Sequence, residues 1–283
     1  MTIQELEKKA KTVRVDLIKM LTEAGSGHPG GSLSATDLIA ALYFDKLKHN
    51  PKKPDWEERD RVIFSKGHVC PLLYACLAET GYFPLEELMT LRKLGSRLQG
   101  HPAKNKGLPG IEVSSGSLGQ GLGVGVGMAL AFKLDKKPNR VYVLMGDGEC
   151  DEGSVWEAAM SAAHYKLDNI CGIVDYNKLQ IDGRVEDVMA VAPLAEKWCA
   201  FGWNVIEIDG HKMSDIVAAY DKAAAAKGKP SVIVANTIKG KGVSFMENNP
   251  GWHGKTPSKE QAELALKELA IVLTEKDLQD ASA

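Results

Sequence analysis

Residues 141–153 read VYVLMGDGECDEG, and this stretch decides the fold. Its apolar, β-branched start is typical of a strand buried on both faces, and it ends abruptly in a glycine-flanked acid. Similar apolar runs follow at 170–175 (ICGIVD), 203–208 (WNVIEI) and 231–235 (SVIVA), with helical periodicity between them. Strand starts roughly 30 residues apart are typical of βαβ units, so we predict an α/β fold with a doubly wound, mostly parallel sheet flanked by helices. No linker-like stretch interrupts it, so we expect a single domain over residues 1–283.

The amino-terminal segment has the spacing of an amphipathic helix. Apolar residues recur every three to four positions from residue 3 to 21, after a capping box of Thr2 and Glu5 and before a stop at Gly25. The pair Ser34 and Asp37 repeats the capping signature before LIAALYF, so we expect a second helix to begin there.

Two polar side chains follow neighbouring strands of the predicted sheet. Asp147 comes directly after the first strand, and Asn177 lies 30 positions later, at the end of the next. Ligands of such folds bind beyond the carboxyl ends of the strands, so we expect the two side chains to be adjacent at that edge. Gly-Asp-Gly alone also fits a structural turn, but a carboxylate and an amide oxygen are hard ligands that suit Mg²⁺ or Ca²⁺ beside a diphosphate. A helix predicted over 152–164 would favour an anion at its amino end.

Composition excludes several classes of protein. Thirty-five basic against 37 acidic residues leave a formal charge of −2, too balanced for a nucleic-acid-binding surface. The amino terminus has no apolar run of a secretory signal, and no apolar run approaches the roughly 20 residues of a membrane span. Five cysteines without a C-x-x-C pair indicate a reducing compartment, so we expect a cytoplasmic protein that binds neither membrane nor nucleic acid.

Glycine is the compositional anomaly. The chain has 28 glycines, and ten of them fall between Gly95 and Gly127, after a short strand-like run at 61–65 (RVIFS). Such a region is suited to close backbone approach. For Gly123, Gly125 and Gly127 we expect ordinary close packing at the start of a buried helix. The same alternating run lacks the G-x-G-x-x-G spacing of a dinucleotide site, and Gly254-Lys255-Thr256 lacks the glycine that a P-loop requires.

Seven motifs, in order, resemble the amino-terminal part of the transketolase family. They are SGHPGG (26–31), SKGH (65–68), QGHP (99–102), GSLGQG (116–121), GDGECDEG (146–153), DYNKLQIDG (175–183) and KGKG (239–242) with WHG (252–254). The resemblance covers nearly the whole chain but only the first of the family's three domains. Two related kinds of thiamine diphosphate enzyme, deoxyxylulose phosphate synthase and the two-oxoacid dehydrogenase α subunit, share the metal motif but are not expected to carry this whole set.

The resemblance implies a diphosphate-binding domain that uses thiamine diphosphate and Mg²⁺, with Ca²⁺ or Mn²⁺ as alternative metals. It implies a partner chain with the pyrimidine-binding and carboxy-terminal domains, in a heterotetramer, and sugar-phosphate substrates as in the pentose phosphate pathway. The activity implied is transfer of a two-carbon ketol unit from a ketose phosphate to an aldose phosphate. The activating glutamate would belong to the partner, so we expect this chain to be inactive alone.

Residue roles carried over from the family fall into three sets. The metal ligands would be Asp147, Asn177 and the backbone oxygen of Leu179. The cofactor contacts would be His68, Gly116, Ser117, Leu118, Gly148, Glu152, Asn177 and His253, with Glu152 at the subunit interface. The catalytic groups would be His28, His101 and His253. Where this chain has Ser117 the family often has proline, which changes the rigidity of that loop.

Histidines suit the implied chemistry, because several protons must move near neutral pH. The remaining histidines, His49, His164 and His211, are expected to be structural or surface residues. A competing interpretation from another class is a non-catalytic subunit that retains the cofactor. The sequence leaves the sugar open, including branched, deoxy and sulfonated substrates.

Overall fold

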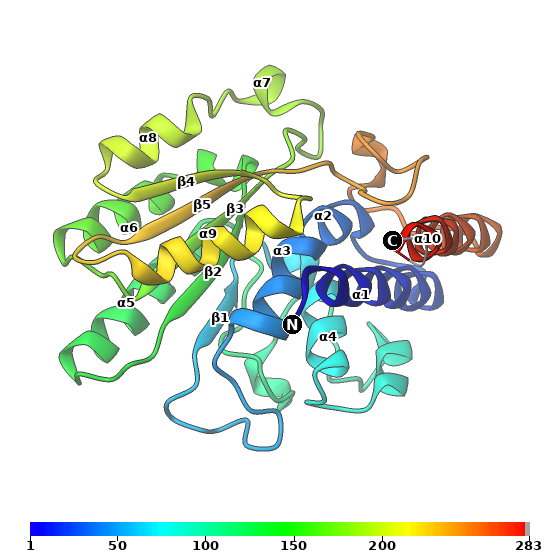
Figure 1. The fold of residues 1–283 in the computed structure, drawn as a ribbon, viewed down its shortest axis with the longest axis horizontal. Coiled ribbons are helices and arrows are strands. Elements are labelled where there is room, and N and C mark those ends of the chain that lie inside the picture. Colours follow the sequence, from blue (N-terminus) through cyan, green and yellow to red (C-terminus); the bar gives the residue numbers. More distant parts are fainter. Residues whose placement is uncertain (281–283) are drawn as a thin grey trace.

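Five parallel strands form the central sheet of the computed structural model, which describes residues 1–280 and side chains up to residue 269. The strand order is β1-β2-β3-β5-β4 (Figure 1). Their bounds are β1 Arg61–Phe64, β2 Val141–Gly146, β3 Ile170–Tyr176, β4 Asn204–Asp209 and β5 Ser231–Asn236. The register pairs Gly146 of β2 with Asp175 of β3, so Asp147 and Asn177 emerge at one edge of the sheet. The predicted fold class and strand positions are confirmed.

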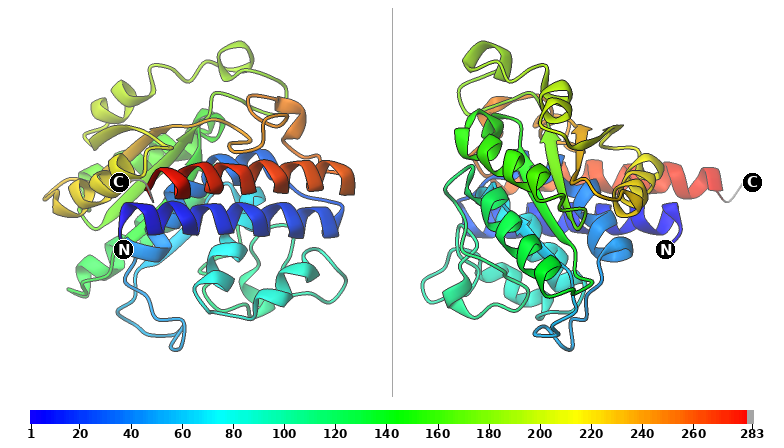
Figure 2. Two further views of the ribbon diagram at one scale, coloured as in Figure 1. Left: turned by 45° about the vertical axis from the view of Figure 1, so that its right-hand side comes forward. Right: turned by 90° about the vertical axis from the view of Figure 1, so that its left-hand side faces the viewer.

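The helices cover both faces of the sheet, and alternate strand residues feed two separate cores (Figure 2). Tyr142 and Leu144 of β2 face one core, whereas Val143 and Met145 face the other. The first core is packed mainly by α1 (Ile3–Ala24), α3 (Thr36–Ala41), α4 (Cys70–Glu79) and α9 (Met213–Ala225), and the second by α5 (Gln120–Leu134), α6 (Gly153–His164) and α8 (Leu194–Ala200). Because both faces are buried, β2 reads as a continuous apolar run.

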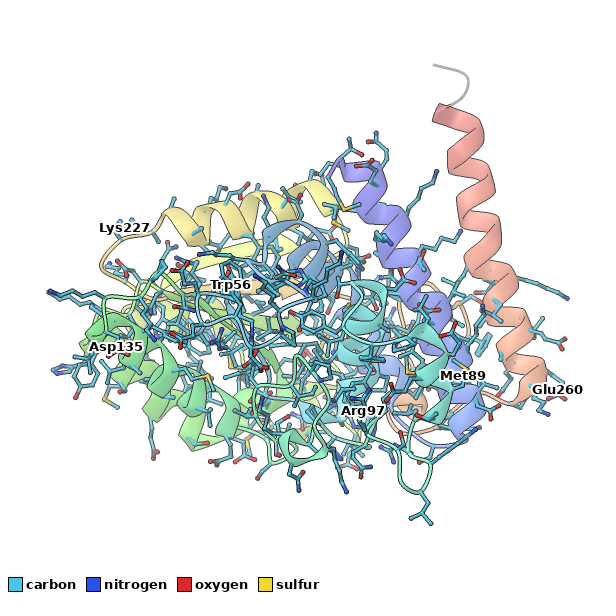
Figure 3. All side chains as sticks on the ribbon, turned by 90° about the horizontal axis from the view of Figure 1, so that it is seen from below. Trp56, Met89, Arg97, Asp135, Lys227 and Glu260 are labelled. Carbon is cyan, nitrogen blue, oxygen red and sulfur yellow. The ribbon has the colours of Figure 1, made fainter. Side chains whose placement is uncertain are left out.

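The long α1 begins and ends where its sequence signals predict. Thr2 and Glu5 form the reciprocal capping box, and Gly25 ends the helix with a left-handed φ of 59°. The carboxy-terminal helix α10 (Lys259–Asp280) lies alongside α1 (Figure 2). Side chains crowd the space between the layers, with Lys227 and Asp135 toward one end and Glu260 toward the other (Figure 3).

The capping prediction at Ser34 is wrong. Ser34 is the last residue of a short helix, α2 (Pro29–Ser34), and α3 follows after Ala35 without a side-chain cap. The Ser34 hydroxyl donates to the carboxylate of Asp175, and its oxygen also lies 3.0 Å from the carbonyl oxygen of Gly31. The local pattern assigned this side chain to a helix cap. It bonds a buried carboxylate instead, because a buried carboxylate requires hydrogen-bond donors.

Two of the three glycines assigned to close packing in α5 are in the open. A Cβ on Gly125 would lie 2.6 Å from Val143 Cγ2, so that prediction holds there. Gly123 and Gly127 are exposed, with no described atom within 4 Å of the place that a Cβ would take. They lie on the outer face of α5, where the sheet contributes no neighbours.

Short helical turns make up the rest of the described elements. They are η1 Leu42–Lys46 (a π turn), η2 Gly67–Val69, η3 Leu85–Thr90, η4 Lys104–Lys106, η5 Gly148–Asp151, α7 Val185–Val188 and η6 Pro250–Trp252. None of the helices in the described part of the chain has the length and apolarity that crossing a membrane requires.

Candidate cofactor and active site

A cavity of about 350 Å³ opens beyond the carboxyl ends of β1, β2 and β3, within the usual size range of small-molecule sites. It draws side chains from segments far apart in the sequence. Every quoted motif contributes to its wall, and the residues that line it are His28, Gly31, Lys66, His68, His101, Gly116, Leu118, Gly146, Asp147, Gly148, Glu149, Asn177, Leu179, Gln180, Ile181, Asp182, Lys239 and His253.

The predicted metal ligands lie together in this cavity. Asp147 accepts hydrogen bonds from its neighbour Gly148 N at 2.8 Å and from Lys178 N, and Asn177 Oδ1 accepts from Leu179 N at 3.2 Å. Each oxygen keeps a lone pair for a further partner. Burial and the nearby Asp175 carboxylate raise the pKa of Asp147 to about 6, because both disfavour its ionised form. A bound cation would stabilise that ionised form.

These residues fit a divalent cation that takes part of its coordination shell from a ligand or from water. Among the described residues there is no group of three or more His, Cys, Asp or Glu side chains that could hold a metal. The expected set has one carboxylate, one amide oxygen and one backbone carbonyl, so a diphosphate or water must complete the six oxygen positions that Mg²⁺ takes. The Leu179 carbonyl already accepts from Lys239 Nζ at 3.1 Å, which leaves one lone pair.

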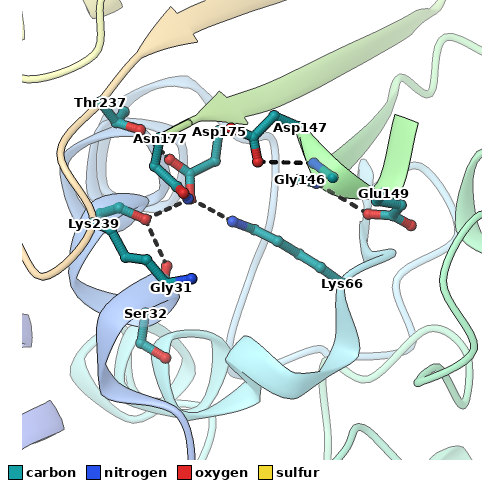
Figure 4. A network of polar contacts seen from close by, with 12 residues as sticks. Gly31, Ser32, Lys66, Gly146, Asp147, Glu149, Asp175, Asn177, Thr237 and Lys239 are labelled. Carbon is teal, nitrogen blue, oxygen red and sulfur yellow. Dashed lines mark hydrogen bonds and ion pairs between the residues drawn. The ribbon is translucent and has the colours of Figure 1, made fainter. Parts of the chain in front are cut away.

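Asp175 is a fully buried hub that the sequence motifs contain but to which they assign no role. It accepts from the Ser34 and Thr237 hydroxyls. It also accepts from Lys66 Nζ and from Asn177 Nδ2 at 3.1 Å (Figure 4). Burial opposes its charge, but Lys66 and the two hydroxyls outweigh that effect and keep the pKa of Asp175 below its ordinary value. The bond from Asn177 Nδ2 fixes the amide, so that its oxygen is the atom left for a ligand. The sequence signal was an acid at the end of an otherwise apolar strand.

Lys239 is a second cationic residue of the cavity without an assigned role in the sequence. It is only 2% exposed, and its Nζ lies 3.0 Å from His253 Nδ1. Burial and the charge of Lys66 lower the pKa of Lys239 to about 8. Two buried ammonium groups facing a cavity favour an anionic ligand. The KGKG motif contained this residue, but nothing in its local spacing showed that it reaches the cavity.

Four histidines form a cluster on the other side of the cavity. His28, His68 and His253 have ring centroids 5.1–5.4 Å apart, and His101 lies 6.4 Å from His28. Burial, followed by neighbouring positive groups, lowers the pKa of all four, to about 4 for His28 and about 3 for His253. The rings are therefore neutral at pH 7 and able to accept a proton or share a hydrogen bond.

The glycine-rich loop borders the cavity in part. Gly116 and Leu118 line it, whereas Ser117 and Glu152 do not. Gly116 has a φ of 156°, and a Cβ there would lie 3.2 Å from His101 Cδ2. Glu149, which the sequence motifs did not single out, anchors this loop, because its carboxylate accepts from Gly119 N at 2.8 Å, from Gly146 N at 3.0 Å and from Ser65 Oγ.

The remaining histidines lie outside the cavity. His211 Nδ1 is 2.9 Å from the buried Asp37, and its Nε2 accepts from Ile238 N at 2.8 Å. His49 stacks on Tyr82 with ring centroids 5.7 Å apart, and His164 is exposed. These contacts agree with the structural or surface positions expected for them.

Comparisons with known proteins match this arrangement. The family model described as "Transketolase, thiamine diphosphate binding domain" matches residues 6–271. A 6-deoxy-6-sulfo-D-fructose transketolase subunit of a Clostridium species is 47% identical, over 94% of this chain and 96% of that protein. One of the subunits of the apulose-4-phosphate transketolase of Phocaeicola vulgatus is 44% identical, over 95% of both. The transketolase structure of Campylobacter jejuni superimposes with a TM-score of 0.90 at 35% identity, and the match covers 95% of this chain but only 43% of that protein.

Proposed function

The chain belongs to the transketolase family and carries its thiamine diphosphate-binding domain, and on this premise we propose that it transfers two-carbon ketol units together with a partner subunit. The observation that carries the proposal is the cavity itself, where Asp147 and Asn177 face a cluster of four neutral histidines. A domain that only retained the cofactor would have no use for the histidine cluster.

We assign the cofactor's diphosphate to the strand-end side of the cavity. Asp147, Asn177 and the Leu179 carbonyl would hold Mg²⁺, while Gly148 lines the cavity beside them and Lys66 and Lys239 supply positive charge. Thiamine diphosphate, when bound, supplies the nucleophile and the electron sink for cleavage next to a carbonyl. Gly116, Leu118, His68 and His253 would flank it, and Ser117 and Glu152 would act from outside the cavity.

We assign proton transfer and sugar binding to His28, His101 and His253. Their pKa values lie below the ordinary value, so each ring is neutral at pH 7 and presents a nitrogen lone pair to a sugar hydroxyl. We propose that this lone pair takes the hydroxyl proton and returns it in the next step. Ring nitrogens that face the cavity would also hydrogen-bond the sugar hydroxyls and so hold the sugar in place. The rings of His101 and His253 lie 6.4 and 5.4 Å from that of His28, a cluster that suits a relay of this kind better than a single fixed base would.

A separate chain is proposed to complete the site. The two relatives named above are called subunits and match this chain over nearly their whole length, whereas the chain covers 42% of human transketolase. Exposed apolar residues lie around the cavity mouth and on α5 and α6, with Ile181 67%, Met160 58% and Val124 41% exposed. Beside them the bare Gly123 and Gly127 leave room for close helix packing. We propose that these exposed residues contact the pyrimidine-binding chain, in a heterotetramer.

The substrate is proposed from the relatives' names to include a modified sugar. Those names give 6-deoxy-6-sulfo-D-fructose and apulose 4-phosphate, whereas the family resemblance alone implies ordinary pentose phosphates. A panel of these two sugars with xylulose 5-phosphate and fructose 6-phosphate would separate the modified-sugar pathways from the pentose phosphate pathway. All five cysteines are free, in keeping with the cytoplasmic location that we propose.

The test is an assay of ketol transfer with the chain alone, the copurified partner alone, and both together. We expect turnover only in the mixture with thiamine diphosphate and Mg²⁺. Full turnover by this chain alone would overturn the shared site, and bound cofactor without turnover in the mixture would favour the non-catalytic subunit. Met160→Glu, on the outer face of α6, should prevent assembly, whereas Glu157→Gln on the same helix should not.

A further inference from the structure

Arg92 joins two segments that carry histidines of the cavity. Its Nη1 donates to Ser26 Oγ at 3.0 Å, and its Nη2 donates to the Gly100 carbonyl at 3.3 Å. Ser26 is two residues before His28, and Gly100 directly precedes His101. Arg92 itself does not line the cavity, so its hydrogen bonds are to the segments that carry the histidines and not to the rings.

The surrounding backbone is shaped to admit the guanidinium. A Cβ on Gly100 would lie 2.7 Å from Arg92 Cζ, so only glycine leaves the space that the side chain fills. Arg92 has a φ of 61°, a left-handed conformation that is uncommon for a residue other than glycine. Its N–H donates to the Leu98 carbonyl at 2.8 Å, which closes the loop between them. The left-handed backbone and this hydrogen bond together fix the point from which the Arg92 side chain leaves the loop.

The charge of Arg92 is not neutralised by an acid. Within the described residues no carboxylate oxygen lies within 4.0 Å of its guanidinium, whereas its neighbour Lys93 pairs with Glu23 at 2.6 Å. Burial first, and then the Arg92 charge, lower the pKa values of both His28 and His101. His28 also faces His68, His101, His253 and Lys239, and the carbonyl of His101 accepts from Tyr74 OH at 3.3 Å.

The two rings depend on the backbone for their position. His28 Nδ1 is buried and has no hydrogen-bond partner in the part of the chain that the structure describes. We infer that Arg92 is a positioning residue that ties the Ser26–His28 segment to the Gly100–His101 segment and so sets the spacing of the two rings. This inference rests on the proposed function, because it assigns the spacing a use in sugar binding and proton transfer.

The experiment compares Arg92→Met, which removes the charge and both hydrogen bonds, with Arg92→Lys, which keeps the charge and one donor. Lys93→Met is the matched control at the next position, where the side chain is 51% exposed. Methionine and lysine are both unbranched, so neither Arg92 variant adds a clash at the left-handed position. Thiamine diphosphate affinity should be the same in all of them, since Arg92 does not line the cavity.

The first readout is an NMR pH titration of the histidine rings in this chain alone, which needs no activity. The pKa values of His28 and His101 should rise in Arg92→Met, because a positive neighbour is lost, and stay low in Arg92→Lys and Lys93→Met. The second is ketol transfer by the complex obtained by tagging this chain in its own cells. Arg92→Met should lose roughly 100-fold in kcat/KM, as expected for a misplaced catalytic group, and its acid limb should move to higher pH. Arg92→Lys should recover part of the rate and the original acid limb.

Identical behaviour of Arg92→Met and Lys93→Met in both readouts would overturn the inference. If Arg92→Met does not fold, Ser26→Ala removes one tie and leaves the charge, and it should lower kcat/KM several-fold without moving the acid limb. An unchanged rate in Ser26→Ala would then count against the positioning role. A wild-type complex without ketol transfer would contradict the proposed function, while the NMR titration would still decide whether Arg92 acts on the two rings.

Discussion

The two sides of the cavity are held in place by different means. On the strand-end side, Asp147, Asn177 and Asp175 are fixed by hydrogen bonds from backbone amides, hydroxyls and Lys66 (Figure 4). On the opposite side, His28 and His101 are placed by loops and by ring packing. The strand-end side is therefore organised before any ligand arrives, and the histidine side keeps free nitrogens for a substrate. Under the roles that we propose, the cofactor side of the cavity has its hydrogen bonds satisfied within the protein, whereas the proton-transfer side leaves ring nitrogens such as His28 Nδ1 without partners among the described residues.

The largest expected effect tests whether the strand-end side of the cavity governs cofactor binding. We expect Asp147→Ala to abolish Mg²⁺-dependent binding of thiamine diphosphate, because it removes the only carboxylate among the proposed metal ligands. Calorimetric titration with and without Mg²⁺ measures this. The exposed Asp135→Ala is the control, and an unchanged affinity in Asp147→Ala would remove the metal assignment.

The histidine side should show the opposite pattern. His28→Ala and His101→Ala should lose about 100-fold or more in kcat, the usual share of a general acid–base group, and keep their cofactor affinity. The same holds for turnover in His253→Ala, although its contact with Lys239 is also lost there. Steady-state kinetics of the assembled enzyme and cofactor titration test this together, with His164→Ala as the exposed control. Weaker cofactor affinity in His28→Ala or His101→Ala, with turnover restored at saturating cofactor, would move these residues from proton transfer to cofactor binding.

Hydrogen bonds on the strand-end side should contribute measurably to stability. Ser34→Ala removes one of the hydroxyls that donate to the buried Asp175, and we expect a loss of about 1.5–3 kcal/mol in the free energy of unfolding. Urea denaturation of Ser34→Ala and of the exposed Ser214→Ala gives the difference. Equal stability of the two variants would show that Asp175 does not depend on this donor.

The last comparison concerns pH and the histidine side. The pKa of His28 is about 4 in the folded chain against 6.5 for the free side chain, chiefly because of burial and then Arg92, His101 and Lys239. Below pH 6.5 the unfolded chain binds this proton before the folded chain does, so this share of the stability is complete above pH 6.5 and is lost as the pH falls toward 4. The unfolding temperature of His28→Gln should therefore fall less steeply than that of wild type as the pH decreases from 6.5 to 4. His164→Gln is the matched control, and parallel curves for His28→Gln and wild type would contradict the shift.

Much of this site could be predicted from sequence, and the reason lies in the sheet. A parallel strand shows its burial as an apolar run, and the order of strands along the chain placed Asp147 and Asn177 at one edge. Asp175 and Lys239 were part of the quoted motifs, yet Asp175 bonds Ser34 from 141 positions away and Lys239 bonds the Leu179 carbonyl from 60 positions away. Local spacing carries no information about such contacts, which is also why Ser34 was assigned to a cap.

The sequence by itself determined the periodic elements, the family and the residue types that the chemistry needs, because these depend on neighbours within one strand or helix turn. Only the tertiary structure decided which groups meet. It brought Lys239 against His253, aimed the guanidinium of Arg92 at Ser26 and Gly100, and left Gly123 and Gly127 open while Gly125 packs on Val143. The physical reason is that charge neutralisation, hydrogen-bond satisfaction and packing depend on distance in space, and a glycine or a lysine in the sequence does not specify its distant neighbours.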